Sequence, residues 1–354
     1  MSPPVKEVPG PSTPTAEERT TSAGFLRERV FTSTSPVWIF LVLVVITAVF
    51  SLMRPSSFLS SFDIKSIFIN ASVDLLLSVG MTYVIITAGI DLSVGSVLVF
   101  SGVIAAKVMI AIGGGSTHAV NAGWGVILAG CAIGILAGLA WGVFNGVLIA
   151  LMRIPPLIVT LGSFGMALGL ADVITGGVDV AGIPSQLGST IGSGQLGPIP
   201  WLVLISAVIT VLLGVVLHLT RFGRYTYAIG SNDEAARRAG IAVNRHLIKV
   251  YALAGALAGV GGVLSLAYFT TTTISGHVTD NLIAISAVVI GGTSLFGGSG
   301  TMFGTVVGVF IPVVLAQGLI IVNVQSFWQQ VVIGAILIIA VYFDQLRRRT
   351  RSRR

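Results

Sequence analysis

Charge is scarce in this sequence. Only 9% of its 354 residues are Asp, Glu, Lys or Arg, whereas an average soluble domain carries about 25% charged residues. Hydrophobic residues make up 54% of the chain. So few charges cannot cover a water-soluble globule of this size, and the composition therefore predicts an integral membrane protein.

Cysteine is nearly absent, because Cys131 is the only one and lies inside an apolar run. It excludes an intrachain disulfide and a thiolate metal cluster, and we expect a small buried side chain there. The histidines are scattered: His118, His246 and His277 fall in predicted loops, and His218 ends a predicted span. No metal site and no cofactor are predicted.

A Gly-Lys pair is missing as well, and every P-loop needs one to cradle and neutralise phosphate. The lysines follow Val5, Ile64, Ala106 and Ile248. The chain is therefore predicted to hold no ATPase site and not to be an enzyme. Energy for any transport must come from a partner or from an ion gradient.

Long apolar runs fill the remainder of the chain, and each is long enough to cross about 30 Å of hydrocarbon as a helix. The 44 glycines favour close packing between such helices. The predicted fold is an all-α, polytopic transmembrane bundle of about ten helices. The predicted spans are 36–53, 67–89, 92–112, 124–150, 156–175, 200–219, 247–269, 282–298, 302–323 and 326–343, with Gly-rich breaks within 67–112 and 282–323 as possible re-entrant turns.

The positions of the basic residues indicate the membrane topology of the chain, although a net charge of +7 would also be compatible with nucleic-acid binding. They gather in the tails 1–35 and 344–354, at Arg153 and in the break 221–249, whereas Arg54, Lys65 and Lys107 lie elsewhere. Lys and Arg stay on the cytoplasmic side of membrane helices, so we expect an even number of spans with both termini cytoplasmic. Residues 1–35 are rich in Pro, Ser, Thr and charge and are predicted to be a disordered cytoplasmic tail, not a signal peptide. Residues 344–354 are predicted to be a basic cytoplasmic tail behind a permease domain at 36–343.

The hydrophilic break at 221–247 contains a predicted short helix. Asn232 or Asp233 is suited to cap it, Glu234 favours its first turn, and Gly240 ends it. A polar, exposed and well-capped helix between membrane spans suits docking to a soluble partner. A basic interfacial loop that meets anionic membrane lipid is the alternative interpretation.

The motif Glu234-Ala235-Ala236 followed by Gly240 resembles the Glu-Ala-Ala loop of ABC importer permeases, which inserts into a groove of the ATPase subunit. Gly223-Arg224-Tyr225 and Ala228-Ile229-Gly230 resemble the ribose-type branch of that family. Further blocks similar to this branch follow one another along the chain: 79–82 with 89–96, 155–162 and 287–295. The resemblance extends across about 36–343.

This resemblance implies a type II ABC importer-like permease with an ABC ATPase subunit, an extracytoplasmic solute-binding protein and a second permease copy, as in a homodimer. It also implies a bacterial inner-membrane location. The ATPase-coupling residues that it implies are Gly223, Arg224, Asn232, Glu234, Ala235, Ala236, Arg237 and Gly240. The chain departs from the family at Leu168, where an Arg is common, and at Asn281 and Ile283, where acidic residues are common.

Polar residues inside the apolar runs are candidates for the translocation path, because such residues are costly in lipid. Asp91 lies in a Gly-flanked break, where it can cap the next helix, contact solute or form a shallow interfacial turn. Asn70 and Asp74 share a helix face, which suits either a polar path or a structural hydrogen bond. Asn145, Thr160 and Gln317 are interpreted in the same way.

The few charges in the spans suit a neutral, sugar-like solute, whether a pentose, a hexose, a polyol or a furanosyl signal molecule. The alternative function is an ion-coupled secondary transporter, which would use intramembrane carboxylates such as Asp74 and Asp91. That class does not account for the Glu-Ala-Ala loop. The sequence therefore favours an importer permease.

Overall fold

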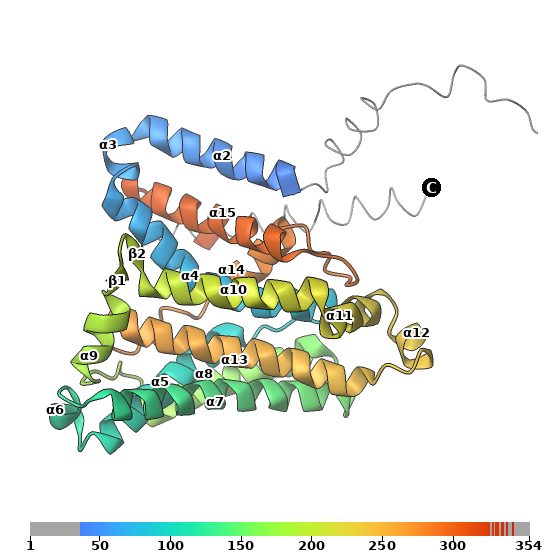
Figure 1. Ribbon diagram of the computed structural model, residues 1–354, viewed down its shortest axis with the longest axis horizontal. Helices are drawn as coiled ribbons and strands as arrows, with labels where there is room; N and C mark the ends of the chain where they lie inside the picture. The colour runs from blue at the N-terminus through green and yellow to red at the C-terminus, as the bar shows by residue number, and fades with distance from the viewer. Residues whose placement is uncertain are drawn as a thin grey trace, which may run out of the picture.

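The structure, a computed structural model, describes residues 36–325 and, beyond them, only residues 328, 330–332, 334, 335, 338 and 342. This part of the chain is almost entirely helical (Figure 1). The long helices are α2 (Pro36–Met53), α4 (Ser61–Ile86), α5 (Val94–Ile112), α7 (Trp124–Ala150), α8 (Pro156–Thr175), α10 (Trp201–Leu219), α13 (Val243–Phe269) and α15 (Met302–Ile321).

Shorter elements join these helices. They are α3 (Pro55–Phe58), α6 (Ser116–Ala119), α9 (Ser185–Leu187), the π-helical turn η2 (Gly188–Gly192), β1 (Gln195–Leu196), β2 (Ile199–Pro200), α11 (Arg221–Ser231), α12 (Asp233–Arg238) and α14 (Asp280–Ile290). The two strands form an antiparallel hairpin in which Gln195 is opposite Pro200 and Leu196 is opposite Ile199. The predicted all-α class is confirmed.

Seven helices, α4, α5, α7, α8, α10, α13 and α15, are long and apolar enough to cross a membrane. The apolar segments Ile39–Met53 of α2 and Asp280–Ile290 of α14 are shorter. Each of the first nine predicted spans overlaps a helix, and the last, 326–343, lies largely outside the described residues, as do the predicted tails 1–35 and 344–354. The chain is a multi-pass membrane protein.

Three predicted boundaries are corrected. The span predicted at 282–298 ends as α14 at Ile290, because the glycine-rich segment that follows turns through positive φ, including +88° at Gly292. α4 begins at Ser61, since the Ser60 side chain accepts from the Asp63 amide at 3.1 Å. α13 begins at Val243, so His246 lies in a helix and not in a loop.

The centre of the bundle is α13, which packs against α7, α5 and α4. Glycines at the crossing with α7 let the two backbones approach closely: a β-carbon at Gly259 would lie 2.9 Å from the Cα of Ile135. Cys131 packs beside this crossing but is only partly buried, contrary to the prediction of a buried side chain. The outer faces of α7, α8 and α10 expose large apolar side chains, which include Leu128, Leu136, Leu161, Val173, Val211 and Leu212.

The long helices run roughly side by side, so the bundle has two distinct ends (Figure 1). α11 and α12 lie at one end, and α12 is the outermost helix there. α3, α6, α9 and the β hairpin lie at the opposite end. We call these the α12 end and the hairpin end.

Candidate functional site

The first candidate site is the α11–α12 segment at the α12 end. The sequence predicted a short helix here, and α12 confirms it: the Asn232 side chain caps it by accepting from the Ala235 amide at 2.9 Å. Glu234 forms an exposed ion pair with Arg238, one turn along the helix. Such exposed pairs contribute little, so the caps and the packing of α12 determine its position.

The end of α12 is fixed by Gly240, as predicted. Its φ is +84°, its amide donates to the Arg237 carbonyl, and the Ile241 amide donates to the Ala236 carbonyl, each at 3.0 Å. This pair of bonds is the Schellman motif, in which the carbonyls at a helix end find partners. Ile241 and Ala236 also pack in one apolar cluster with Val243. The outer face of α12 is left exposed, and it carries charged side chains beside Ala235.

α11 was missed by the sequence analysis, which expected a loop before Ser231. It is an 11-residue helix with Gly223 buried against the Leu217 carbonyl and Arg224 exposed. Glycine lowers helix propensity by about 1 kcal/mol, so two glycines in this segment hid the helix. Packing against the bundle offsets that cost.

α11 ends in direct backbone contact with the last residue of α4 and with the Gly-rich 291–301 break. A β-carbon at Gly230 would overlap the Ile86 carbonyl and lie 2.7 Å from the Gly298 amide nitrogen. The Gly298 amide donates to the Ile86 carbonyl at 2.9 Å, and the Tyr227 hydroxyl donates to the Gly300 carbonyl at 2.8 Å. The segment therefore touches the end of α4, directly before the 87–93 break, and the 291–301 break without an intervening side chain at Gly230.

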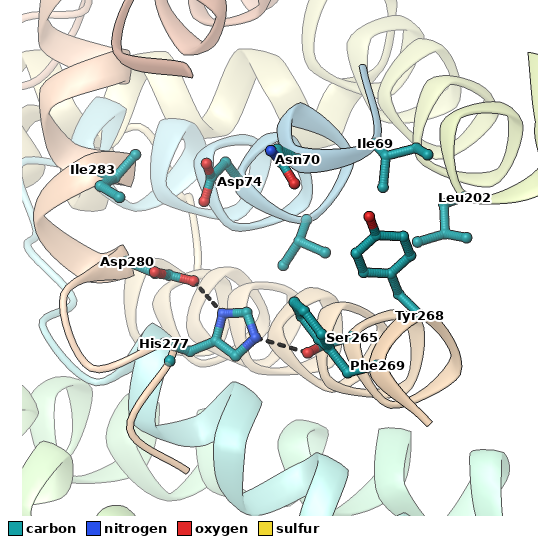
Figure 2. A pocket seen from close by; sticks show the side chains of 12 residues that line it. Ile69, Asn70, Asp74, Leu202, Ser265, Tyr268, Phe269, His277, Asp280 and Ile283 are labelled. Carbon is teal, nitrogen blue, oxygen red and sulfur yellow. Dashed lines mark hydrogen bonds and ion pairs between the residues drawn. The ribbon is translucent and has the colours of Figure 1, made fainter. Parts of the chain in front are cut away.

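The second candidate site is a cleft of about 170 Å³ between α4, α10, α13 and α14 (Figure 2). It brings together Asn70 and Asp74, which the sequence placed on one helix face. Across from them lie His277 and Asp280, near Ser265. The last turn of α13 and the first turn of α10 line the cleft, so it lies in the half of the bundle toward the hairpin end.

A hydrogen-bonded chain forms one wall of this cleft. Ser265 Oγ lies 2.7 Å from His277 Nε2, and His277 Nδ1 lies 2.6 Å from Asp280 Oδ2. A hydrolase triad has this order but also needs amides free to hold an oxyanion. The amides of Gly276 and Asp280 instead donate to the carbonyls of Thr273 and His277. These two amides are therefore not available to an oxyanion.

Asp91 lies in a separate, buried network and does not line the cleft. Its Oδ1 accepts from the Ser93 amide at 2.9 Å and from the Ser93 hydroxyl at 2.6 Å, just before α5 begins. Asn145 donates to the same hydroxyl at 2.9 Å. Thr160 bonds to the Pro156 carbonyl at 2.9 Å and to the Ile90 carbonyl at 3.3 Å. Thus the break after α4 is tied to α7 and α8.

Gln317 is apart from both groups, because its amide donates to Asp63 Oδ1 at 2.7 Å and links α15 to the start of α4. The three residues at which the chain departs from the family pattern lie in three different environments. Asn281 donates to the Leu92 carbonyl at 2.9 Å, Ile283 lines the cleft, and Leu168 is partly buried against an apolar core cluster.

The sequence analysis missed His277 and Asp280 as site residues. No local pattern identified them, since their neighbour Asp74 is about 200 positions away in the chain. Within the described residues, no group of three or more His, Cys, Asp or Glu side chains is placed to hold a metal ion.

Comparison with known proteins gives consistent matches over most of the chain. Residues 64–341 match the family described as branched-chain amino acid transport system / permease component. The chain is 35% identical over 308 residues to the D-allose transport system permease protein of Escherichia coli (strain K12), covering 87% of this chain and 90% of that protein. It is 37% identical to the ribose import permease protein of Bacillus subtilis (strain 168), over 86% and 91% of the two chains. It is 36% identical to the L-arabinose ABC transporter permease protein of Azospirillum brasilense, over 88% of each chain. No solved structure matches.

Proposed function

This chain belongs to the permease-component family of branched-chain amino acid transport systems, and from this premise we propose that it carries a sugar-like solute inward as part of an ATP-binding-cassette importer. The single observation that carries the mechanism is α12, a capped helix that stands out from the bundle on a segment in backbone contact with the end of α4 and with the Gly-rich 291–301 break (Figure 1). The relatives named for D-allose, ribose and L-arabinose support a sugar as the solute.

The α12 end is assigned to the cytoplasm of a bacterial inner membrane. Arg153 and the basic residues of 221–249 lie at this end, whereas Arg54 and Lys65 lie toward the hairpin end. The positive-inside rule therefore supports an α12 end that faces the compartment where ATP is available. With an even number of spans, both termini are cytoplasmic.

A separate ABC ATPase subunit docks on α12. The helix offers Ala235 and Ala239 on its exposed surface, so it can enter a groove without steric conflict. Glu234 and Arg237 supply polar contacts at the rim, and Arg224 lies exposed on α11. Movement of the ATPase then displaces α11 as a rigid body and shifts the end of α4 and the 291–301 break through Gly230.

The remaining partners follow from the importer assignment. An extracytoplasmic solute-binding protein delivers the solute at the hairpin end. A second permease copy covers part of the apolar outer surface, because ABC importers work with paired permease domains. The solute is neutral and polyhydroxylated, which suits spans with few charges.

The polar residues of the spans divide into two roles. Asn70 and Asp74, which line the cleft, are proposed for the solute path. Asp91, Asn145 and Thr160 are proposed to hold the 87–93 break in a shape that α11 can displace. Gln317 is proposed to hold α15 against α4 near the hairpin end.

Reconstitution tests the function and separates it from an ion-coupled transporter. The chain is co-purified with its ATPase in lipid nanodiscs, and ATP hydrolysis is measured with the binding protein and D-ribose, D-allose or L-arabinose. We expect at least one sugar to stimulate hydrolysis, and Glu234→Lys to abolish this stimulation while the chain still inserts in the membrane. Sugar uptake that stops with an ionophore and persists with an ATPase inhibitor would overturn the proposal.

A further inference from the structure

Two carboxylates of the cleft have oxygen atoms without a partner. Asp74 forms no hydrogen bond or ion pair within the described part of the chain, and it lines the cleft beside Asn70 (Figure 2). Asp280 is only 6% exposed and its Oδ2 bonds to His277, whereas its Oδ1 has no partner among the described residues. An ionised carboxylate accepts hydrogen bonds through both oxygens, so these atoms are available to the hydroxyl groups of a molecule in the cleft.

The remaining residues that line the cleft add aromatic and apolar surface to its polar groups, which is a combination suited to a sugar. Tyr268 and Phe269 place aromatic rings on one side, and Ile69, Val73 and Leu202 add apolar surface. Aromatic and apolar walls with a few placed polar groups are typical of small-molecule sites. Hydroxyl groups then donate to the carboxylates, while C–H faces pack against the rings.

We propose that this cleft is a solute subsite inside the permease subunit, which holds one neutral polyhydroxylated molecule of monosaccharide size through Asp74 and Asp280. The proposal rests on the importer function and names the substrate class of its cleft. His277 is a positioning residue, because it is held by Ser265 on one side and orients the Asp280 carboxylate on the other.

The size and charge of the cleft favour a neutral, polyhydroxylated molecule of monosaccharide size. A volume of about 170 Å³ equals about six water molecules at ~30 Å³ each, which is enough for one sugar ring. No Lys or Arg lines it, so an anion has no counter-charge there. The directional groups of Asn70, Ser265 and Tyr268 suit an array of hydroxyls better than a single point charge.

The subsite is expected to bind weakly. A transported solute must enter a site favourably and still leave it, so high affinity would stop passage. The cleft lies toward the hairpin end, where the binding protein is proposed to release the solute. Its residues can therefore reject a delivered molecule that lacks the matching hydroxyls.

Saturation-transfer NMR on the permease–ATPase complex in nanodiscs, without binding protein, tests this subsite. D-ribose, D-allose and choline are the probes, and Asp74→Asn is compared with Asp172→Asn, a matched change at an exposed carboxylate outside the cleft. We expect sugar signals in the wild type, a loss of sugar affinity of at least about tenfold in Asp74→Asn, and no change in Asp172→Asn. His277→Phe should weaken sugar binding less than Asp74→Asn.

Three results would overturn the subsite: no sugar signal in the wild type, equal sugar affinity in Asp74→Asn, or choline that displaces the sugars through Asp74. Sugar-stimulated ATP hydrolysis is measured in parallel on the complete complex with binding protein. If hydrolysis is stimulated while the NMR result is negative, the subsite fails and the importer function stands. If no sugar stimulates hydrolysis, the importer function fails whatever the NMR result.

Discussion

Gly240→Val should uncouple ATP hydrolysis from solute delivery. Gly240 has φ of +84° at the end of α12, a conformation that residues with a β-carbon rarely adopt. No atom lies within 4 Å of the position where a β-carbon would stand. The substitution therefore acts on the backbone and leaves the packing around it unchanged.

The magnitude follows from the left-handed conformation, which costs an L-residue about 1–2 kcal/mol and a β-branched residue more. α12 has six residues, far fewer than the ~12–15 at which an isolated helix becomes marginally stable. Its caps must therefore supply much of its order. A loss of 1–2 kcal/mol lowers the ratio of ordered to disordered α12 by about 5- to 30-fold, and we expect coupled hydrolysis to fall by up to that factor.

The assay is sugar- and binding-protein-stimulated ATP hydrolysis in nanodiscs, with assembly measured by co-purification of the ATPase. Gly240→Asn is the first control, because Asn tolerates the left-handed region and should keep most of the coupling. Gly197→Val is the second, since Gly197 has φ of +63°, an open β-carbon position and a place in the hairpin at the opposite end. Full coupling in Gly240→Val, or equal losses in Gly240→Val and Gly240→Asn, would refute this account of α12.

Further predictions concern topology, the α11 junction and the buried network. In a cysteine-free background, Thr117→Cys should react with an impermeant maleimide in intact cells and Ala239→Cys should not; the reverse labelling would reject the assigned orientation. Gly230→Val should cost about 1–3 kcal/mol by overpacking the neighbouring backbone, measured as a lower thermal midpoint, and should reduce coupled hydrolysis more than basal hydrolysis. Asn145→Ala should cost about 1 kcal/mol, since it removes the bond to Ser93, and an unchanged thermal midpoint would contradict that role.

Local chemistry made α12 predictable from the sequence. A cap at Asn232 and a glycine stop at Gly240 act within a few residues, so the pattern contains all the information needed. The end of α14 was harder to predict. The sequence analysis extended this span to 298 and noted a Gly-rich break in the region, but only the positive φ angles of the glycines place the helix end at Ile290.

The candidate site was only half predictable, because its contacts join distant segments. Asn70 and Asp74 are one turn apart and their shared face could be predicted. His277 and Asp280 enter the cleft only through the packing of α14 against α4, which no spacing in a single sequence reveals. For the same reason, the link between Asp91 and Asn145 became visible only in the fold.

The contact of Gly230 with Ile86 and Gly298 has a consequence for exchanging ATPase partners between importers. A graft that replaces only α12 would keep the recognition surface of the donor. It would leave that surface attached to the α11 of the recipient, which does not come from the same protein. α11 transmits the movement, and its fit against Ile86 and Gly298 depends on the absence of a side chain at position 230. A chimera that is meant to accept a foreign ATPase should therefore exchange 221–241 as one module, together with any compensating change near 86–88 and 297–298.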